Sequence, residues 1–500
     1  MQWNQLLAEK RLGGSIIIEE YTEKKYPRRE YEKDYKRILN CASFRRLQDK
    51  TQVFPLDKSD FVRTRLTHSC ETSAIAKTLG KMIVSNLRHK NQDKQAIIDI
   101  PEILACAGLI HDIGNPPFGH FGEEIIQKWF ITNLNKFKIA DGINDEMPIS
   151  IVLAELQEDF HHFDGNAQAL RILTKLHFHD SDWGLNLTAP VLGTLIKYPS
   201  FSGQVRSESD REYNICCKKM GLFCAEQETY KNITQITGTD ETCRHPLAYV
   251  LEAADDIAYK TADIEDGFKK GLYNLDQLTK FADEILDDFE YDEKKTGYST
   301  KLFEKLKEMR NKLSTTYEKE IVDKDFAAMQ NWIPYVQEWL MYCAAYRFNG
   351  SYSYIMSGRY KFDLFHDTHH EYSMKIIEKI MVKFIYSNRD ILKLELAANT
   401  ILTSLFDRFI PAVLYHDEIY KCKEHVEIEA YKKLYKILSD NYIESYKMEL
   451  REYKKKESDL DKIRRWDIYL RLLLVVDYIS GMTDSYAKSL YQELTGIYKL

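Results

Sequence analysis

The sequence is poor in the residues that interrupt helices or staple small secreted domains. Only 11 of its 500 residues are proline, so long helices can run without interruption. Its nine cysteines, an odd number without a CxxC pair, argue against a disulfide-stapled fold and are typical of reduced thiols. Cys216, Cys217, Cys224 and Cys243 could be imagined as zinc ligands, but their spacing matches no standard zinc site.

Long apolar runs and an excess of positive charge are also missing. The most apolar late stretch, residues 472–479, is short and contains Asp477, whereas a membrane-spanning helix needs about 20 apolar residues. Residues 1–11 have no apolar core followed by a cleavage site, so we expect a cytoplasmic protein that does not contact membranes. The net charge of −7 argues against a surface devoted as a whole to nucleic acid.

Helical periodicity is what the sequence has in abundance. Apolar residues recur at three- and four-residue spacing over residues 69–87, 102–111, 247–263 and 461–478. A hydrophobic content of 44% is sufficient for a large core, and strand-like alternation is rare. We therefore predict a nearly all-α protein, built as one elaborated domain or as two domains.

The sharpest local signal is a His-Asp pair framed by glycine and proline. An apolar helix leads into His111 and Asp112, and the chain then breaks at Gly114, Pro116 and Pro117. Near a helix end both side chains can turn toward one cation, and an imidazole with a carboxylate suits Mn, Fe, Co, Ni or Zn and tolerates Mg. The glycine and proline residues are expected to bring the backbone close to a ligand. Three other His-Asp pairs lack this frame and are interpreted as surface or capping pairs: 179–180, 366–367 and 416–417.

Further candidate ligands lie on two other predicted helices. Arg65 and His68 are three residues apart and share one helix face. Asp255, Tyr259 and Asp263 follow one another at four-residue steps and form a single stripe. Unpaired carboxylates on an otherwise apolar face are costly unless they meet a metal ion or hydrogen-bond donors, so the stripe indicates a site.

Taken together, these segments resemble the deoxyguanosine-triphosphate triphosphohydrolase family of the HD-domain superfamily. The segments that carry the resemblance are Phe44–Pro55, Arg65–Ser69, His111–Glu123, Phe163–Gln168, Ile196–Pro199, Asp255–Asp263 and, near the C-terminus, Asp477–Asp484. The resemblance implies an all-α HD-domain helical core with large helical elaborations. We expect a catalytic core over 1–270, a charged helical elaboration over 271–366 and a C-terminal helical region over 367–500 that packs on the core. No motif is recognised between 272 and 462.

The resemblance also implies an activity and a cofactor. The family hydrolyses deoxynucleoside triphosphates, with dGTP as the favoured substrate here, to deoxynucleoside and tripolyphosphate by water attack on the α-phosphate. One divalent ion per subunit is implied, Mg²⁺ or Mn²⁺ first, with Fe, Co, Ni or Zn as alternatives. Its ligands would be His68, His111, Asp112 and one aspartate of 255–256. Asp255 is preferred because it matches the family's four-residue steps, although helix geometry also allows Asp256.

Roles in the reaction can be assigned to further residues by the same resemblance. His120 is the candidate general acid, because a reference pKa near 6.5 suits proton transfer around neutral pH. Glu123, three residues on, would orient and charge its imidazole. The side chains expected to bind the triphosphate are Arg65, Asn166, Lys197 and Lys219, and Tyr198 is expected to bind the substrate without a more specific role. Met220 replaces the aromatic residue that the family has after Lys219.

Selection of deoxyribose would depend on three residues. A ring of Tyr259 packed under C2′ leaves no room for a 2′-hydroxyl group, while Asp263 and Gln52 can hydrogen-bond the 3′-hydroxyl. The alternative for Tyr259 is plain core packing, since the chain has 33 tyrosines.

Two other functions stay open at this point. An HD-type phosphodiesterase acting on a cyclic nucleotide or an alarmone would share the metal ligands without needing the sugar and triphosphate residues. A single-stranded nucleic-acid-binding protein is suggested by Tyr446–Arg465, where basic residues and tyrosines interleave, although acidic residues in the same stretch favour a solvated helix face. The family resemblance also allows a single-stranded DNA or nucleotide effector, and implies a homo-oligomer such as a hexamer.

Overall fold

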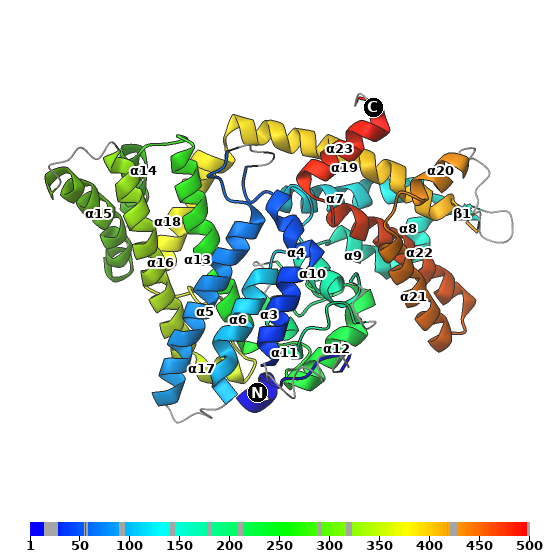
Figure 1. Cartoon of the computed structure of the whole chain (residues 1–500), viewed down its shortest axis with the longest axis horizontal. Helices are drawn as coiled ribbons and strands as arrows, with labels where there is room; N and C mark the ends of the chain where they lie inside the picture. The colour runs from blue at the N-terminus through cyan, green and yellow to red at the C-terminus, as the bar shows by residue number, and fades with distance from the viewer. Residues whose placement is uncertain are drawn as a thin grey trace.

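The computed structural model of the chain is almost entirely helical (Figure 1). It describes residues 1–14, 29–54, 56, 59–89, 96–140, 146–177, 183–207, 214–288, 293–316, 323–417, 419–420 and 428–497. Within these ranges the only strands are β1 (Lys138–Ala140) and β2 (Glu146–Pro148), a short antiparallel pair in which Ile139 lies opposite Met147. The predicted all-α class is confirmed. In the described part of the chain, no helix has both the length and the apolar character needed to cross a membrane.

Three packed helices carry the centre of the candidate site. They are α5 (Arg65–His89), α6 (Ile100–Ile110) and α13 (Pro246–Lys269), and both α5 and α13 contact α6. Helix α6 is apolar and buried along nearly its whole length, which holds its C-terminal end in the core. Gly108 near that end allows α5 to come close, because a Cβ atom there would lie 2.6 Å from Cα of Ser73.

Shorter helices complete the first half of the chain around these three. They are α1 (Trp3–Leu6), α3 (Glu30–Asn40), α4 (Ala42–Arg46), η1 (Leu47–Asp49), η2 (Ala96–Asp99), α7 (Gly119–Asn133), η3 (Leu134–Lys136), α8 (Ile149–Leu153), η4 (Ala154–Gln157), α9 (Glu158–His161), α10 (Gly165–Thr174), α11 (Ala189–Leu195), η5 (Ser202–Gln204), η6 (Ile215–Cys217), η7 (Cys224–Glu226) and α12 (Gln227–Thr237).

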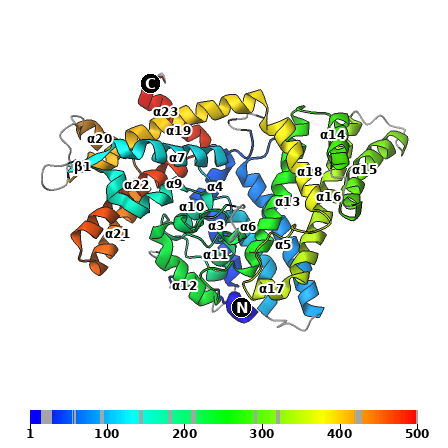
Figure 2. The ribbon, with the colours of Figure 1, turned by 180° about the vertical axis from the view of Figure 1, so that it is seen from behind.

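The middle of the sequence forms helices that lie mostly at one end of the molecule, except α17 (Tyr352–Met356), which lies near the N-terminus (Figures 1 and 2). These are α14 (Leu275–Asp288), α15 (Glu293–Thr316), α16 (Lys324–Gly350), α17 (Tyr352–Met356) and α18 (Glu371–Met381). Helix α16 packs along α13 and α5, and it buries Trp332 against Phe303 of α15. Helix α18, which the predicted division assigns to the C-terminal region, packs against α13, α14 and α15. One face of this charged segment is therefore buried.

The C-terminal helices span the molecule and contact the first half of the chain. A π-helical turn, η8 (Val382–Tyr386), leads into α19 (Arg389–Tyr415), which runs across the top of Figure 1 and packs on α7. After it come α20 (Ile428–Tyr435), α21 (Asp440–Lys456), α22 (Leu460–Ser480) and α23 (Asp484–Thr495). The buried second half of α22 lies against α10 and α19, so the end of the chain reaches the elements that surround the candidate site.

Candidate metal centre and active site

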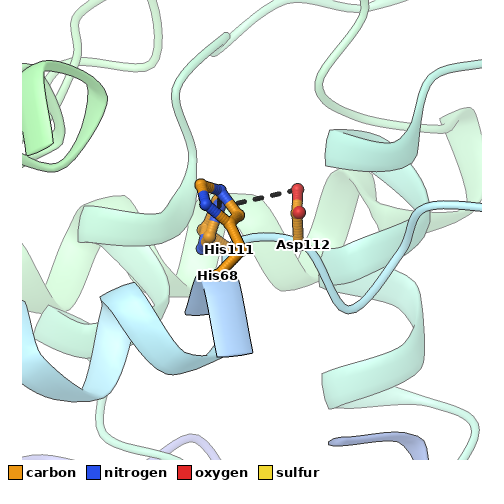
Figure 3. Close-up of side chains that lie close together, drawn as sticks. All are labelled: His68, His111 and Asp112. Atoms are coloured by element: carbon orange, nitrogen blue, oxygen red, sulfur yellow. Dashed lines mark hydrogen bonds and ion pairs between the residues drawn. The ribbon is translucent and has the colours of Figure 1, made fainter. Parts of the chain in front are cut away.

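Two imidazole rings and two carboxylates converge where α5, α6 and α13 meet. His68, in the first turn of α5, and His111, at the end of α6, place their Nε2 atoms 3.3 Å apart (Figure 3). Ligand atoms of these two residues and of Asp112 all lie within 4.8 Å of one another. Asp255 of α13 adds its Oδ1 atom 3.1 Å from each Nε2 atom.

The hydrogen bonds around these side chains fit a bound cation. Nδ1 of His111 lies 2.8 Å from the carbonyl oxygen of Gly108, so it carries the ring proton and leaves Nε2 as a lone pair. That lone pair faces a second imidazole and a carboxylate oxygen, which repel it unless a cation or a proton lies between them. Two nitrogen and two oxygen donors make a set suited to one divalent metal ion.

Arginine and lysine keep the two carboxylates charged. Nη1 of Arg65 lies 2.6 Å from Oδ2 of Asp112, and this cation holds the pKa of Asp112 well below its usual range in spite of burial, which raises it. Lys197 donates to Oδ2 of Asp255 and lowers its pKa against the same effect of burial. The neighbouring Asp256 contacts neither imidazole ring, and burial raises its pKa to about 7. The geometry therefore supports Asp255 as the ligand.

A cavity of about 670 Å³ opens in front of these side chains, a size usual for small-molecule sites. Every side chain predicted for the site lines it: Gln52, Arg65, His68, His111, Asp112, His120, Glu123, Asn166, Lys197, Tyr198, Lys219, Asp255, Tyr259 and Asp263. The site predicted from separate sequence segments is thus brought together in one place.

Each cation predicted to bind the triphosphate is already paired with a carboxylate. Besides the two pairs above, Nζ of Lys219 lies 2.9 Å from Oδ2 of Asp164. The side-chain and backbone nitrogen atoms of Asn166 both donate to Oδ1 of the same aspartate, at 2.6 and 2.8 Å. Two of the groups expected to bind phosphate, Lys219 and Asn166, are therefore bonded to Asp164 in this structure.

The expected pairing of His120 with Glu123 is not seen. Instead, Oε1 of Glu123 accepts a 2.8 Å hydrogen bond from the backbone N–H of Gly165, and burial raises the pKa of this buried carboxyl to about 8. No hydrogen bond joins it to His120, although both residues are described. The ring of His120 is exposed at the cavity wall. The surrounding cavity walls, which reduce the solvation of the charged ring, and the cations of Lys219 and Arg65 lower the pKa of His120 to about 4, which is low for a general acid at neutral pH.

The glycine residues of this segment allow other parts of the chain to pack closely against it. A Cβ atom on Gly114 would lie 2.1 Å from the carbonyl oxygen of Gly165, at the start of α10. Gly119 has a φ of 61°, and a Cβ atom there would lie 2.4 Å from Nη2 of Arg65. The glycines let α10 and the Arg65 side chain pack against the turn that follows His111 and Asp112. A glycine needed for such packing and a glycine needed for contact with a ligand look the same in a sequence pattern.

The side chains predicted to bind deoxyribose line the cavity, and one of them, Asp263, has a hydrogen-bond partner that sequence analysis missed. The hydroxyl of Tyr386 donates to Oδ2 of Asp263 at 3.1 Å, and burial raises the pKa of this aspartate to about 8. Oε1 of Gln52 is buried and has no hydrogen-bond partner among the described residues, as expected of a group that awaits a ligand. Tyr386 belongs to the region without recognised motifs, and nothing in its local pattern marks it.

Tyr198 has a structural role in addition to lining the cavity. It is buried, and its ring packs against the guanidinium group of Arg244, 5.2 Å from the ring centroid. Burial raises its pKa well above the usual value, so it stays protonated.

In the described part of the chain, neither the other His-Asp pairs nor the four cysteines form a cluster suited to a metal ion. His366 stacks on Phe362 and His416 on Tyr435, while the pair at 179–180 lies outside the described residues. Sγ of Cys243 faces the carbonyl oxygen of Gly358, and the only metal-suited cluster among the described side chains is that of His68, His111 and Asp112.

The aromatic residues of the basic stretch are occupied by packing. Tyr453 stacks on Trp466, and the buried Tyr446 donates to Oδ1 of Asp467. Several of the basic side chains pair with acidic neighbours, for example Lys455 with Glu452. The two tyrosines are therefore not free to stack on bases, which favours a solvated helix face.

Comparison with known proteins agrees with the geometry of the site. A family model for the HD domain matches residues 65–197. The chain is 41% identical, over 99% of its length and 100% of the relative, to a deoxyguanosinetriphosphate triphosphohydrolase-like protein of Listeria monocytogenes. A protein of the same description from Synechocystis sp. is 32% identical over 99% of this chain and 100% of the relative. The deoxyguanosinetriphosphate triphosphohydrolase of Yersinia enterocolitica is 30% identical over 93% of this chain and 94% of the relative. This chain belongs to the deoxyguanosinetriphosphate triphosphohydrolase family of HD-domain enzymes.

Proposed function

We propose that this enzyme hydrolyses deoxynucleoside triphosphates, with dGTP favoured, to the deoxynucleoside and tripolyphosphate by water attack on the α-phosphorus. One observation carries the proposal. A single cavity holds the imidazole and carboxylate cluster, three cations and, at another wall, the pair of Asp263 and Tyr386 beside Tyr259. A cyclic nucleotide or an alarmone would need the metal ligands but not this combination.

The metal ion is proposed to be held by His68, His111, Asp112 and Asp255. Mg²⁺ or Mn²⁺ is our first choice, and Fe, Co, Ni or Zn would also suit these donors. A divalent ion bound there would supply the Lewis acidity that lowers the pKa of water and polarises a phosphoryl oxygen.

The triphosphate is proposed to replace carboxylates as the partner of the cavity's cations. A triphosphate carries about four negative charges, and charge-assisted hydrogen bonds to phosphate oxygens can compete with the existing ion pairs. Lys219 can turn from Asp164 toward a phosphate, because its side chain is partly exposed to the cavity. Lys197 and Arg65 are more deeply buried and lie beside the proposed metal ligands, so they would contact the phosphate that reacts.

His120 is proposed to protonate the leaving 5′-oxygen. As the oxygen of water bonds to the α-phosphorus, the bond from phosphorus to the 5′-oxygen breaks. The released alkoxide takes the proton of His120, and the proton that the water loses passes to solvent. The low pKa of this ring is due in part to the cations of Lys219 and Arg65. A bound triphosphate neutralises these cations and adds negative charge, so it raises the pKa of His120 toward the value that a general acid needs.

Deoxyribose is proposed to lie against Tyr259, with its 3′-hydroxyl near Asp263 and Gln52. Because burial keeps Asp263 protonated near neutral pH, this side chain can donate as well as accept a hydrogen bond. A 2′-hydroxyl group would meet the ring of Tyr259, so ribonucleotides should be rejected.

The division into 1–270, 271–366 and 367–500, a homo-oligomeric assembly, a cytoplasmic location and a nucleotide or single-stranded DNA effector stay predictions. They are supported by the family resemblance.

The test is incubation of the purified protein with each of the four deoxynucleoside triphosphates and with GTP, in the presence of Mg²⁺ or Mn²⁺. Products are separated by ion-exchange chromatography, and His111→Ala is assayed alongside. We expect deoxynucleoside and tripolyphosphate from the wild-type protein alone, with GTP spared. Absence of turnover with all five nucleotides, singly and mixed, would overturn the proposal and leave the phosphodiesterase alternative.

A further inference from the structure

Two charged side chains outside the cavity are almost completely buried at its back wall. Lys50 is 3% exposed and Asp484 is 1% exposed. Burying a charge is unfavourable unless the group is fully hydrogen-bonded, so these two residues call for an explanation beyond packing. Neither has a part in the chemistry proposed above.

Asp484, the first residue of α23, binds two segments that lie far from it in the sequence. Its Oδ2 atom accepts hydrogen bonds from the backbone N–H of Thr51, at 3.0 Å, and from the hydroxyl of the same residue. Its Oδ1 atom accepts a 2.9 Å hydrogen bond from the backbone N–H of Phe118. One carboxylate thus ties the C-terminal helix to both segments.

Lys50 joins neighbouring parts of the chain as a hydrogen-bond donor, whereas Asp484 is an acceptor. Its ammonium group donates to the carbonyl oxygen of Asn115, at 2.5 Å, and to that of Ser480 at the end of α22, at 2.8 Å. Asn115 in turn donates from Nδ2 to Oδ1 of Asp112, at 2.6 Å. The lysine therefore holds the turn that follows the proposed metal ligand.

The tethered residues lie one or two positions before side chains that line the cavity, Gln52 and His120. Thr51 precedes Gln52, whose buried oxygen faces the cavity without a partner. Phe118 lies in the left-handed region with a φ of 64°, a conformation that is unfavourable for a non-glycine residue. It leads through Gly119 into His120, in the first turn of α7. The direction in which His120 enters the cavity thus depends on the backbone at 118–119, which Asp484 holds.

We propose that Lys50, Thr51 and Asp484 form a clamp through which the C-terminal helices position Gln52 and His120 for the reaction. Lys50 and Asp484 do not line the cavity, so they act as positioning residues, while Thr51 lies at the cavity wall and links Asp484 to Gln52. The inference rests on the proposed function, because its catalytic consequence is read through turnover of a deoxynucleoside triphosphate. The clamp also gives a role to residues 477–484, a segment that resembles the family but had no function assigned from the sequence.

The test uses the full-length enzyme with Asp484→Asn and Thr51→Val, which weaken the clamp while changing shape little. Because small displacements of catalytic groups are costly, we expect kcat to fall by about 10- to 100-fold in Asp484→Asn. The affinity for Mn²⁺ should change by less than about twofold, since the clamp does not touch the metal ligands. Thr51→Ser, which keeps the hydroxyl group, should lose much less activity than Thr51→Val.

A matched control removes a hydrogen bond between the same two segments that does not reach the cavity. Oγ of Ser485 donates to Oδ1 of Asp49 at 2.8 Å, and Ser485→Ala is expected to keep kcat. Hydrogen exchange followed by mass spectrometry gives a readout independent of activity. Peptides over 50–54 and 113–122 should exchange faster in Asp484→Asn than in Ser485→Ala.

Two results would overturn the clamp while leaving the proposed function intact. One is an active wild-type enzyme with equal kcat in Asp484→Asn and Ser485→Ala. The other is a loss of kcat that follows a loss of Mn²⁺ affinity in parallel. An inactive wild-type protein would overturn the proposed function instead, together with the catalytic role of the clamp. In that case, equal hydrogen exchange over 113–122 in Asp484→Asn and Ser485→Ala would also exclude the clamp as a structural feature.

Discussion

Single side chains distinguish the residues proposed to bind the metal ion and the sugar. Asp255 and Asp256 are neighbours on α13, yet only the first places a carboxylate oxygen 3.1 Å from both imidazole Nε2 atoms. The second lies in an environment that raises its pKa to about 7, mainly by burial. Two adjacent aspartates therefore have different surroundings, and substitution can test the different roles proposed for them.

Asp255→Asn should abolish metal binding, because it removes a charged oxygen donor from the centre of the cluster. We expect the affinity for Mn²⁺ to fall by more than about 100-fold, while Asp256→Asn should keep it within about threefold. Titration of Mn²⁺ followed by electron paramagnetic resonance measures both. Equal losses in the two variants would contradict the assignment of Asp255.

Tyr386→Phe tests the partner that the structure gives to Asp263. The substitution removes the hydroxyl that donates to Oδ2 of the aspartate and changes little else. Loss of one such hydrogen bond should raise KM for the preferred deoxynucleoside triphosphate by about 3- to 10-fold. Tyr342→Phe, on the exposed face of α16, is the control and should leave KM unchanged. A KM in Tyr386→Phe equal to that of the control would exclude a role in sugar binding.

Helix α13 must be placed accurately, because three of its side chains line the cavity: Asp255, Tyr259 and Asp263. Its start is fixed by His245, whose Nδ1 accepts a hydrogen bond from the backbone N–H of Leu247 and whose Nε2 donates to the carbonyl oxygen of Leu6. This pattern needs the neutral ring, and burial lowers the pKa of His245 to about 4.

Stability should therefore fall as the pH falls below about 6.5. Between the folded pKa of about 4 and the unfolded value near 6.5, only the unfolded chain binds a proton at this histidine. This single group should lower the free energy of unfolding by about 2 kcal/mol from about pH 7 to about pH 5. His245→Asn keeps a capping oxygen without the titration, so its urea-unfolding curves should show a smaller loss. An equal loss in wild type and variant would contradict this account.

Sequence reasoning could predict which side chains lie together where their placement depends on spacing within one helix or turn. His68, His111 and the Asp255 stripe could be placed because each motif shows which residues share a face. The partners of these residues could not be placed in the same way. Tyr386 and Asp484 reach the site from segments that only the folded chain brings there. Likewise, the backbone of Gly165 takes the carboxylate of Glu123 that was expected to orient His120.

At the scale of the whole molecule, buried charged side chains connect the C-terminal helices to the first half of the chain. Arg171 of α10 bonds Asp477 of α22 through Nε, Glu226 through Nη1 at 2.9 Å, and Glu449 of α21 through Nη2 at 2.9 Å. Burial raises the pKa of Glu226 to about 8, so this carboxyl is largely protonated at neutral pH. The cluster anchors the C-terminal helices beside the elements that form the cavity.

Arg171→Met should destabilise the whole protein, because it leaves buried carboxylates without their cation. We expect a loss of about 3 to 5 kcal/mol in the free energy of unfolding, measured in urea. Glu226→Gln should cost much less, since the group it replaces is already protonated. Arg451→Met removes an exposed pair with Glu444 and serves as the control. A loss for Arg171→Met no greater than for this control would show that the cluster does not anchor the helices.

The most direct test of the proposed reaction is the fate of the water oxygen. Wild-type enzyme is incubated with dGTP and Mn²⁺ in water enriched in oxygen-18, and the products are analysed by phosphorus NMR and mass spectrometry. Attack on the α-phosphorus predicts tripolyphosphate with one heavy oxygen on a terminal phosphate and an unlabelled deoxynucleoside. Labelled deoxynucleoside, or dGMP with pyrophosphate, would contradict the reaction derived from the cavity.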